Sequence, residues 1–301
     1  MEFGRTSSLD NILLDLPENH PGTLKVLGGK KAEKCLVHVG CPIWADTGFI
    51  GKIYPKKPKS KDIAKYYSYH FNSIELNISH YKLLDINTIQ HWVDTTYSDF
   101  KFCPKINQIV SHTPFIKSNS NYMKEIMATN KHFNHKLGMP FLQLPPHYDS
   151  TKIHDLLDFC DEVSLSRCAI ELRHESWFNN ENILKTICNY FYKNNITFLI
   201  TDTVGRRDVL HQRLTTKTAF IRFVANDLHQ SDYIRMNAWI DRLQQWIDNG
   251  LEELFFFIHT PSHEFMPEIT TYFLNTLKQK TGINIRLPKI IIKSTSDNKL
   301  F

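Results

Sequence analysis

The stretch Cys168–Trp177, CAIELRHESW, decides how the chain folds, because it joins a buried strand to several charges. Ile170 and Leu172 share one side of an extended strand, and Glu171 and Arg173 share the other. Burying unpaired charge is costly, so a strand that only filled a core would not carry two charges on one face. The pattern predicts a strand that packs its apolar side against helices and turns its charged side toward a polar interior.

Seven other short runs have the same character and alternate with longer amphipathic segments. These runs are CLVHVG (35–40), SIELN (73–77), FKFCPK (100–105), PFLQLP (140–145), ITFLITD (196–202), AFIRFV (219–224) and LFFFIHT (254–260). The helices predicted between or after them are 62–70, 87–95, 119–135, 151–160, 180–194, 231–248 and 264–279.

Eight strands that alternate with helices predict an α/β protein, a single (β/α)8 TIM-like barrel over residues 35–282. An open doubly wound sheet is the alternative, but the G-x-G-x-x-G turn that such a sheet normally carries is missing. Residues 1–34 are expected to form a polar, irregular N-terminal arm. Residues 283–301 are expected to form a basic C-terminal tail that is peripheral or frayed.

The same alternation of side chains can be followed through the other strands. It places polar side chains on the inward side near the carboxyl end of most strands, where the catalytic groups of this fold lie. These side chains are Glu75, Lys105, Gln143, Glu171, Arg173, Asp202, Arg222 and His259. The pattern predicts a polar pocket at the open face of the barrel. The alternative is an ion network that only satisfies its own charges.

Composition restricts the class of protein without naming a function. The chain has 301 residues, of which 42% are hydrophobic and 22% are charged, with a formal net charge of +5. The six cysteines form no C-x-x-C pair, which favours reduced thiols in a cytosolic protein. No signal peptide and no apolar run of about 18–20 residues is present, so we expect a cytoplasmic chain without a membrane partner.

Several segments also resemble one known family, DUF72 (YecE-like), and they occur in the family's order from about Val37 to Leu277. They are VGCPIWAD, YYSYHFNSIELNISHYKL, FKFCPKINQIVSH, LGMPFLQLPPHY, IELRHESWF and AFIRF. The resemblance implies a (β/α)8 barrel but no activity, because the family is named for an unknown function. The chain has GCPIW where the family often has GTSGW, and Ile258, His259 and Thr260 where it often has FNN. These departures indicate that the first loop and the pocket chemistry vary.

The inward charges suggest a specific division of work. Glu75, Glu171 and Asp202 are the candidate catalytic acids and bases. The candidate substrate-binding residues are Lys105, Gln143, Arg173, His174, Trp177, Arg222, His259, Trp44 and Tyr81. The cations among them would hold an anionic group, and Lys105 could act as an electrophile or a Schiff-base amine if burial lowers its pKa.

Four of the candidates lie in loops, where other readings apply. His174 could be a hydrogen-bonded strand cap rather than a base. Trp44 and Trp177 could stack on a planar ligand or pack as lid hinges, and Tyr81 lies on the same rim.

No metal or cofactor is predicted. Glu75, Glu171, Asp202 and His259 offer suitable ligand atoms, but the cations in the same interior would repel a divalent ion, and no H-x-H or H-E-x-x-H occurs.

Two functions remain open at this point. The first is an enzyme of hydrolase or lyase type acting on a small anionic, phosphate- or carboxylate-bearing ligand. The second is a non-catalytic module that binds nucleic acid or an anionic metabolite, which the basic run YPKKPKSKDIAK (54–65) would attract. The oligomeric state is not predicted.

Overall fold

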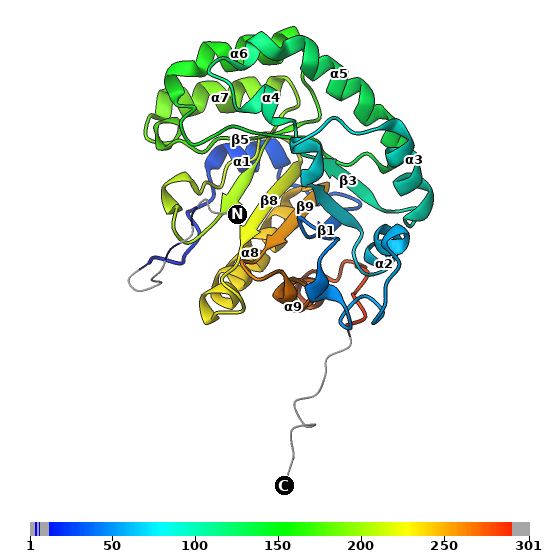
Figure 1. The fold of residues 1–301 in the computed structure, drawn as a ribbon. Helices are drawn as coiled ribbons and strands as arrows, with labels where there is room; N and C mark the ends of the chain where they lie inside the picture. Colours follow the sequence, from blue (N-terminus) through cyan, green and yellow to red (C-terminus); the bar gives the residue numbers. More distant parts are fainter. Residues whose placement is uncertain (1–3, 5, 7–11, 291–301) are drawn as a thin grey trace.

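The computed structural model describes Gly4, Thr6 and residues 12–290. This part of the chain contains nine strands surrounded by helices (Figure 1). The strands are β1 (Leu36–Gly40), β2 (Ser73–Leu76), β3 (Lys101–Pro104), β4 (Phe141–Gln143), β5 (Ala169–Glu171), β6 (Thr197–Phe198), β7 (Ile200–Asp202), β8 (Thr218–Val224) and β9 (Glu253–His259).

All strand pairs are parallel, and they form three sheets with the orders β1-β9-β8-β7, β2-β3 and β4-β5-β6. The prediction of an α/β fold with parallel strands is therefore confirmed. The predicted strand 196–202 is divided into β6 and β7 at Leu199. There the Phe198 N–H donates to the Thr215 hydroxyl at 2.9 Å, and the Leu199 N–H donates to the Ile170 carbonyl at 2.9 Å.

The described helices lie outside the strands. They are α1 (Pro21–Leu27), α2 (Ile63–His70), α3 (Ile86–Thr95), α4 (Gln108–Ser111), α5 (Ser120–Asn130), α6 (Ile153–Glu162), α7 (Glu181–Lys193), α8 (Gln230–Asn249) and α9 (Met266–Thr281). The predicted segments are all helical, although α5 ends five residues before the predicted segment does, and α1 and α4 were not predicted. Local chemistry sets several ends. Asp85 accepts the Thr88 N–H and begins α3, while Gly250, with a φ of 118°, ends α8.

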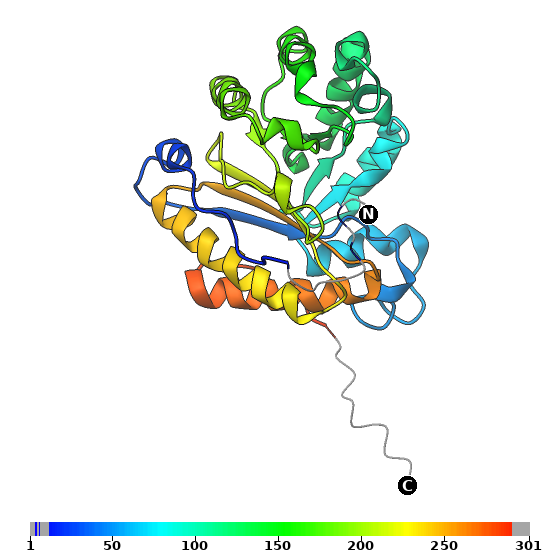
Figure 2. The ribbon, with the colours of Figure 1, turned by 90° about the vertical axis from the view of Figure 1, so that its left-hand side faces the viewer.

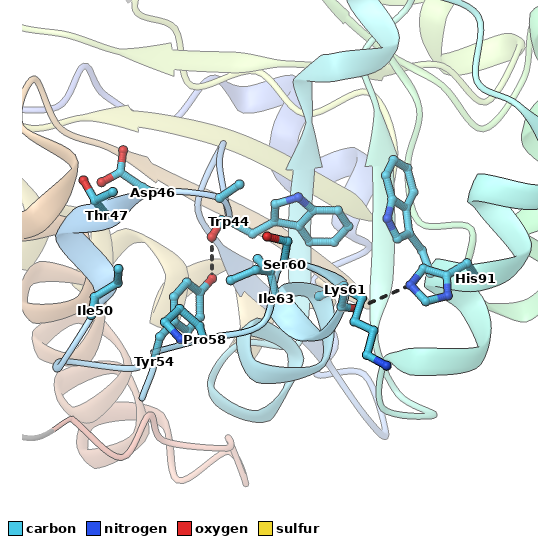
Figure 3. Close-up of a pocket in the computed structure, with 13 residues that line it drawn as sticks. Trp44, Asp46, Thr47, Ile50, Tyr54, Pro58, Ser60, Lys61, Ile63 and His91 are labelled. Atoms are coloured by element: carbon cyan, nitrogen blue, oxygen red, sulfur yellow. Dashed lines mark hydrogen bonds between the residues drawn. The ribbon is translucent and has the colours of Figure 1, made fainter. Parts of the chain in front are cut away.

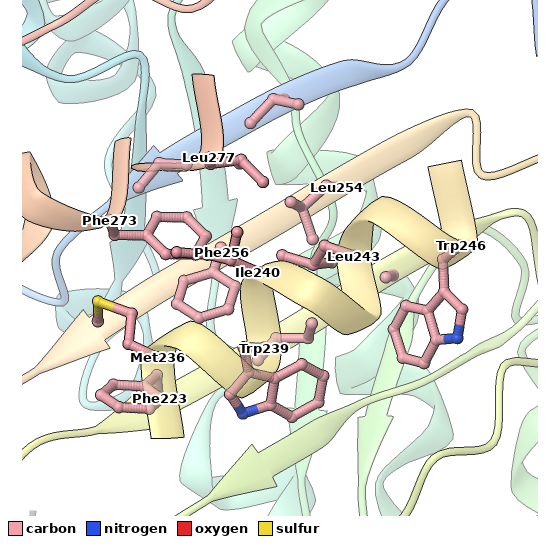
Figure 4. Packing of buried hydrophobic residues seen from close by; sticks show 14 of the residues in the cluster. Phe223, Met236, Trp239, Ile240, Leu243, Trp246, Leu254, Phe256, Phe273 and Leu277 are labelled. Atoms are coloured by element: carbon pink, nitrogen blue, oxygen red, sulfur yellow. The ribbon is translucent and has the colours of Figure 1, made fainter. Parts of the chain in front are cut away.

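The apolar side chains separate into an inner and an outer layer, as period-two alternation requires. The inner cluster includes Cys103, Phe141, Phe220, Phe255 and Phe257. The outer cluster around α8 and α9 joins strand residues of opposite parity to helix residues (Figure 4). Figure 2 shows α8 and α9 side by side along the same side of the strands. The strand interior is thus packed with apolar side chains, and a polar cavity lies beyond this cluster, where the strands end.

Both predicted terminal segments differ from expectation in their described parts. The arm 1–34 is not wholly irregular, because α1 lies within it and Leu27 is buried in the outer cluster. In the tail, Ile285 is buried in the same cluster, and Arg286 donates to the Ser68 carbonyl at 2.7 Å, so residues 283–290 are packed rather than frayed. The rest of the tail lies outside the described residues. Among the described helices, none has the length and apolar character needed to span a bilayer.

Candidate functional site

A cavity of about 780 Å³, here called the strand-end pocket, lies where the strands end. It is lined by Pro42, Ile43, Asn77, His80, Tyr81, Lys105, His112, Gln143, Pro146, Arg173, Arg222, His259, Thr260, His263 and Met266. These residues follow or end β1, β2, β3, β4, β5, β8 and β9. The parity of the strands therefore brings together side chains that are far apart in sequence.

An ion network forms the floor of this pocket, with Arg222 at its centre. Its guanidinium donates to both oxygens of Glu75, at 2.9 and 2.8 Å, and to Glu171 Oε2 at 2.7 Å. The Arg173 Nε–H donates to Glu171 Oε1 at 2.6 Å, and His259 Nε2 donates to Glu75 Oε2 at 2.9 Å. The predicted inward side chains do meet, and they pair directly with one another.

The two carboxylates in this network are fully buried and held in the ionised form. Burial alone would raise the pKa of each, but Arg222 and His259 keep the pKa of Glu75 well below its usual value. Burial and the neighbouring Arg173 and Arg222 charges together leave the pKa of Glu171 at about 2. A general acid needs a pKa near the working pH. In this structure Glu75 and Glu171 orient Arg222 and Arg173, and their lowered pKa values do not favour a role in proton transfer.

Lys105 is the cation of the pocket that this network leaves uncompensated. Within the described part of the chain, its Nζ makes no hydrogen bond or ion pair. Burial lowers its pKa from 10.5 to about 8, and the Arg222 and Arg173 charges add to the effect while Glu75 and Glu171 oppose it. Gln143 completes the floor through a long contact of 3.4 Å with Arg222. Two carboxylates thus face three cations, and the cluster keeps one positive charge in excess.

Three histidines form part of the rim: His80, His112 and His263. The sequence places His80 on this rim together with Tyr81, but it does not indicate His112 or His263. The pKa of His80 is lowered to about 4, first by burial and then by Lys105, and its Nδ1 lies 2.9 Å from the Ile106 carbonyl oxygen. The pKa of His112, 5.0 Å away between ring centres, is also lowered, mainly by burial. His263 Nδ1 lies 2.7 Å from Asp46 Oδ2. An imidazole oriented by a carboxylate in this way is the usual arrangement of an acid–base pair.

The loop that carries His263 is anchored on two sides. Asp46 Oδ1 accepts the Gly48 N–H at 2.7 Å, which fixes the carboxylate beside His263. Asp227 accepts both the N–H and the hydroxyl of Ser262, each at 2.8 Å. Asp227 has a φ of 54°, a left-handed conformation that is uncommon for residues other than glycine. Strain of this kind persists where surrounding contacts hold it, and it is frequent at functional sites.

The expectation that Asp202 points into the pocket is wrong. Its carboxylate faces the outer layer, where Arg207 and Arg235 donate to Oδ1 at 2.5 and 3.0 Å and Trp239 Nε1 donates to Oδ2 at 2.6 Å. The opposite phase of this strand faces inward instead, and the Thr201 hydroxyl donates to Glu171 at 2.8 Å. Asp202 thus ties the strand to α8 and takes no part in the site.

Two loop candidates after β5 have structural tasks. His174 accepts the Ser176 N–H at 3.1 Å and caps the 3-10 helix Glu175–Trp177. Trp177 is fully buried, and its Nε1 donates to the Tyr148 carbonyl at 2.7 Å, so stacking on a ligand is excluded in this conformation. The predicted substrate-binding role of both residues is not supported. His174 is a hydrogen-bonded cap, as the alternative for this residue proposed, but it caps the 3-10 helix and not the strand.

The two remaining candidates are divided between pockets. Tyr81 is 70% exposed and lines the strand-end pocket. Trp44 instead lines a neighbouring cavity of about 560 Å³, together with residues of the loop after β1 and of α3 (Figure 3). Across the described residues, no group of three or more His, Cys, Asp or Glu side chains converges as a metal site.

Comparisons with known proteins agree with the sequence resemblance. Residues 38–290 match the family described as "Protein of unknown function DUF72". UPF0759 protein YecE of Escherichia coli (strain K12) is 22% identical over 253 residues, which are 78% of this chain and 90% of that protein. UPF0759 protein YunF of Bacillus subtilis (strain 168) is 30% identical over 153 residues, 48% of this chain and 53% of that protein.

A solved structure shows the same fold. The crystal structure of a DUF72 family protein from Enterococcus faecalis V583 aligns with a TM-score of 0.62 at 14% identity, covering 83% of this chain and 98% of that one. Since the family match spans most of the chain, the protein belongs to the DUF72 family.

Proposed function

We propose that this protein binds a small anionic molecule, bearing phosphate or carboxylate, in the strand-end pocket. The observation that carries the proposal is the uncompensated ammonium of Lys105, which lines a 780 Å³ cavity beside Arg173. A partly buried cation without a partner costs free energy, and an anionic ligand would supply that partner. Glu75, Glu171 and Arg222 then form the rigid base that orients Arg173.

We further propose that the pocket catalyses a reaction of hydrolase or lyase type. With a pKa of about 8, Lys105 is in part an unprotonated amine near neutral pH, which suits a base or a nucleophile. The His263–Asp46 pair on the rim offers a second proton donor or acceptor. The alternative is a binding module without turnover, and the locked state of Glu75 and Glu171 favours it.

A reactive probe tests both properties of Lys105 together. Pyridoxal 5′-phosphate carries a phosphate and an aldehyde. The aldehyde condenses with an unprotonated amine to an imine and water, and borohydride then reduces the imine to a stable secondary amine. We expect mass spectrometry to find Lys105 labelled faster than the other lysines, with inorganic phosphate slowing the labelling.

The matched control is Lys101, the first residue of β3, the strand that Lys105 directly follows. Its Nζ donates to the His135 carbonyl, and it lies outside the pocket. Labelling of Lys101 at the same rate as Lys105, or labelling of Lys105 that phosphate does not slow, would count against the proposal. Lys105→Arg should keep phosphate binding but lose the labelling, because a guanidinium stays protonated. Turnover that survives in Lys105→Arg would assign catalysis to another group.

We also propose that the three sheets close into one (β/α)8 barrel in which β6 and β7 together make the sixth strand. Backbone contacts across both gaps support it. The Glu75 N–H donates to the Cys41 carbonyl at 3.2 Å, and the Ile106 N–H donates to the Phe141 carbonyl at 2.8 Å. The residues that line the strand-end pocket come from all three sheets, so closure of the barrel would hold them together.

A further inference from the structure

The cavity that contains Trp44, here called the Trp44 pocket, is separate from the strand-end pocket but shares a wall with it. Its volume is about 560 Å³, and it lies between the loop 44–63 and α3 (Figure 3). Pro42 and Ile43 line the strand-end pocket, while the next residues of the same loop line the Trp44 pocket. Asp46 lines the second pocket and contacts His263, which lines the first. One extended ligand could therefore occupy both.

Aromatic rings fixed in place form part of the Trp44 pocket. The indoles of Trp44 and Trp92 meet edge to face, with centres 5.1 Å apart and planes at 71°. Trp44 also packs edge-on against Tyr67 and Phe102, at 6.2 and 6.1 Å. Both indoles are only half-buried although they line the pocket. Rigid, partly exposed rings of this kind are stacking surfaces for planar groups.

Positive charge surrounds these rings. The segment 55–65 carries five lysines and a single acidic residue, Asp62, and all five lysines are exposed. None of them forms an ion pair with any described residue. Lys61 lines the pocket itself, beside His91 (Figure 3). Asp46, the carboxylate in the pocket wall, is already held by His263 and by the Gly48 N–H. The five lysines are Lys56, Lys57, Lys59, Lys61 and Lys65.

We propose that the Trp44 pocket binds an unstacked base of a single-stranded nucleic acid whose phosphates lie along the five lysines. Aromatic stacking surfaces combined with a basic track are the arrangement that binds single strands without sequence preference. A duplex keeps its bases stacked and would not fill the pocket, and an acidic peptide has no need of the indoles. In addition, and resting on the proposed function, a terminal phosphate of the strand reaches Lys105 in the strand-end pocket.

Fluorescence tests the stacking directly. Three of the five tryptophans, Trp177, Trp239 and Trp246, are fully buried. Only Trp44 and Trp92 are available to a stacked base, so we expect hexathymidylate with a 5′-hydroxyl to quench part of the tryptophan emission. Trp92→Leu should weaken binding about tenfold and remove much of the quenching, while circular dichroism reports an unchanged fold.

Charge reversal tests the lysine track with a matched control. The triple variant Lys56→Glu, Lys57→Glu, Lys59→Glu changes the net charge as much as Lys124→Glu, Lys131→Glu, Lys193→Glu, whose lysines lie outside this segment. Fluorescence anisotropy at several salt concentrations gives the slope of log affinity against log salt concentration. The magnitude of this slope should fall by about 2 in the first variant and stay near the wild-type value in the second. Equal losses in both would overturn the proposal, because they would reflect net charge alone.

Competing polyanions and a 5′-phosphate on the strand distinguish base binding at the Trp44 pocket from phosphate binding at Lys105. A thymidine–adenine duplex or polyglutamate that binds as tightly, with the same quenching, would overturn the base-binding proposal. A 5′-phosphate should tighten binding in the wild type but not in Lys105→Met. If the 5′-hydroxyl strand binds and the phosphate adds nothing, the Trp44 proposal stands and the link to the strand-end pocket fails. If inorganic phosphate binds at Lys105 while the strand does not bind, the reverse holds.

Discussion

Replacing Lys105 by methionine should stabilise the protein while removing its affinity for anions. Methionine keeps the apolar stem that lines the pocket and removes an ammonium that has no partner among the described residues. Arg222 and Arg173 repel this ammonium, and burial strips it of water. The wild-type residue therefore costs stability, which is expected where a group is kept for binding a ligand.

The size of the effect follows from the pKa of Lys105. Lowering it from 10.5 to about 8 corresponds to about 3 kcal/mol of unfavourable free energy at neutral pH. The unfolded chain binds more protons than the folded protein between these two values, so wild-type stability rises with pH through this window. The advantage of Lys105→Met should be complete below about pH 8 and disappear as the pH approaches about 10.5.

Urea denaturation of both proteins, near neutral pH and again near pH 10, measures this difference. Lys101→Met serves as the control, and it should lose about 1 kcal/mol because it removes a hydrogen bond to the His135 carbonyl. Adding inorganic phosphate should stabilise the wild type and leave Lys105→Met unchanged. If Lys105→Met is instead less stable by a margin that does not change with pH, Lys105 has a structural partner and the reasoning fails.

Three further changes test one residue of the pocket floor, Glu171, and two buried residues outside the pocket, Asp202 and His211. Glu171→Gln should lower the free energy of unfolding by about 3–5 kcal/mol, because Arg173 and Arg222 lose a buried counter-charge; a variant as stable as wild type in urea that lacks only turnover would restore a catalytic role. Asp202→Asn should cost about 3 kcal/mol by calorimetry but leave phosphate affinity intact, and weakened affinity would contradict its placement in the outer layer. Burial lowers the pKa of His211 to about 3, so this side chain stays neutral in the folded protein while the unfolded chain takes up a proton. The free energy of unfolding should therefore fall as the pH drops below about 6.5, and it should fall less steeply in His211→Gln. The same pH dependence in both proteins would contradict a neutral, buried His211.

The period of two in the strands predicted most of the interior correctly. In β5, Ile170 is in the outer core and Glu171 is in the ion network, and the same division holds for Ile221 and Arg222 in β8. The prediction succeeded because one phase of these strands is purely apolar and the other ends in charge. A slip by one residue would turn Ile170 and Ile221 inward and Glu171 and Arg222 toward the helices, which fixes the register.

The sixth strand gave no such guide. Phe198 and Ile200 alternate with Leu199, so both phases begin apolar, and the charge of Asp202 suggested the inward phase. Arg235 and Trp239 on α8 hold the Asp202 carboxylate in the outer layer, and no local sequence pattern predicts these contacts. Pairs that are remote in sequence were missed for the same reason, since His263 and Asp46 are 217 positions apart.

The arrangement of charge also explains why the floor of the pocket needs two carboxylates. With Glu75 and Glu171 ionised, Arg222 has both carboxylates as partners and Arg173 is held by its Nε–H, so neither arginine has to move to accept a ligand. Donors fixed before binding avoid the cost of ordering them afterwards. The excess positive charge then falls on Lys105, whose pKa of about 8 is close enough to neutral for it to gain or lose a proton. Ligand binding with proton transfer requires two kinds of charge. The paired charges hold the site rigid, and the unpaired charge of Lys105 can gain or lose a proton.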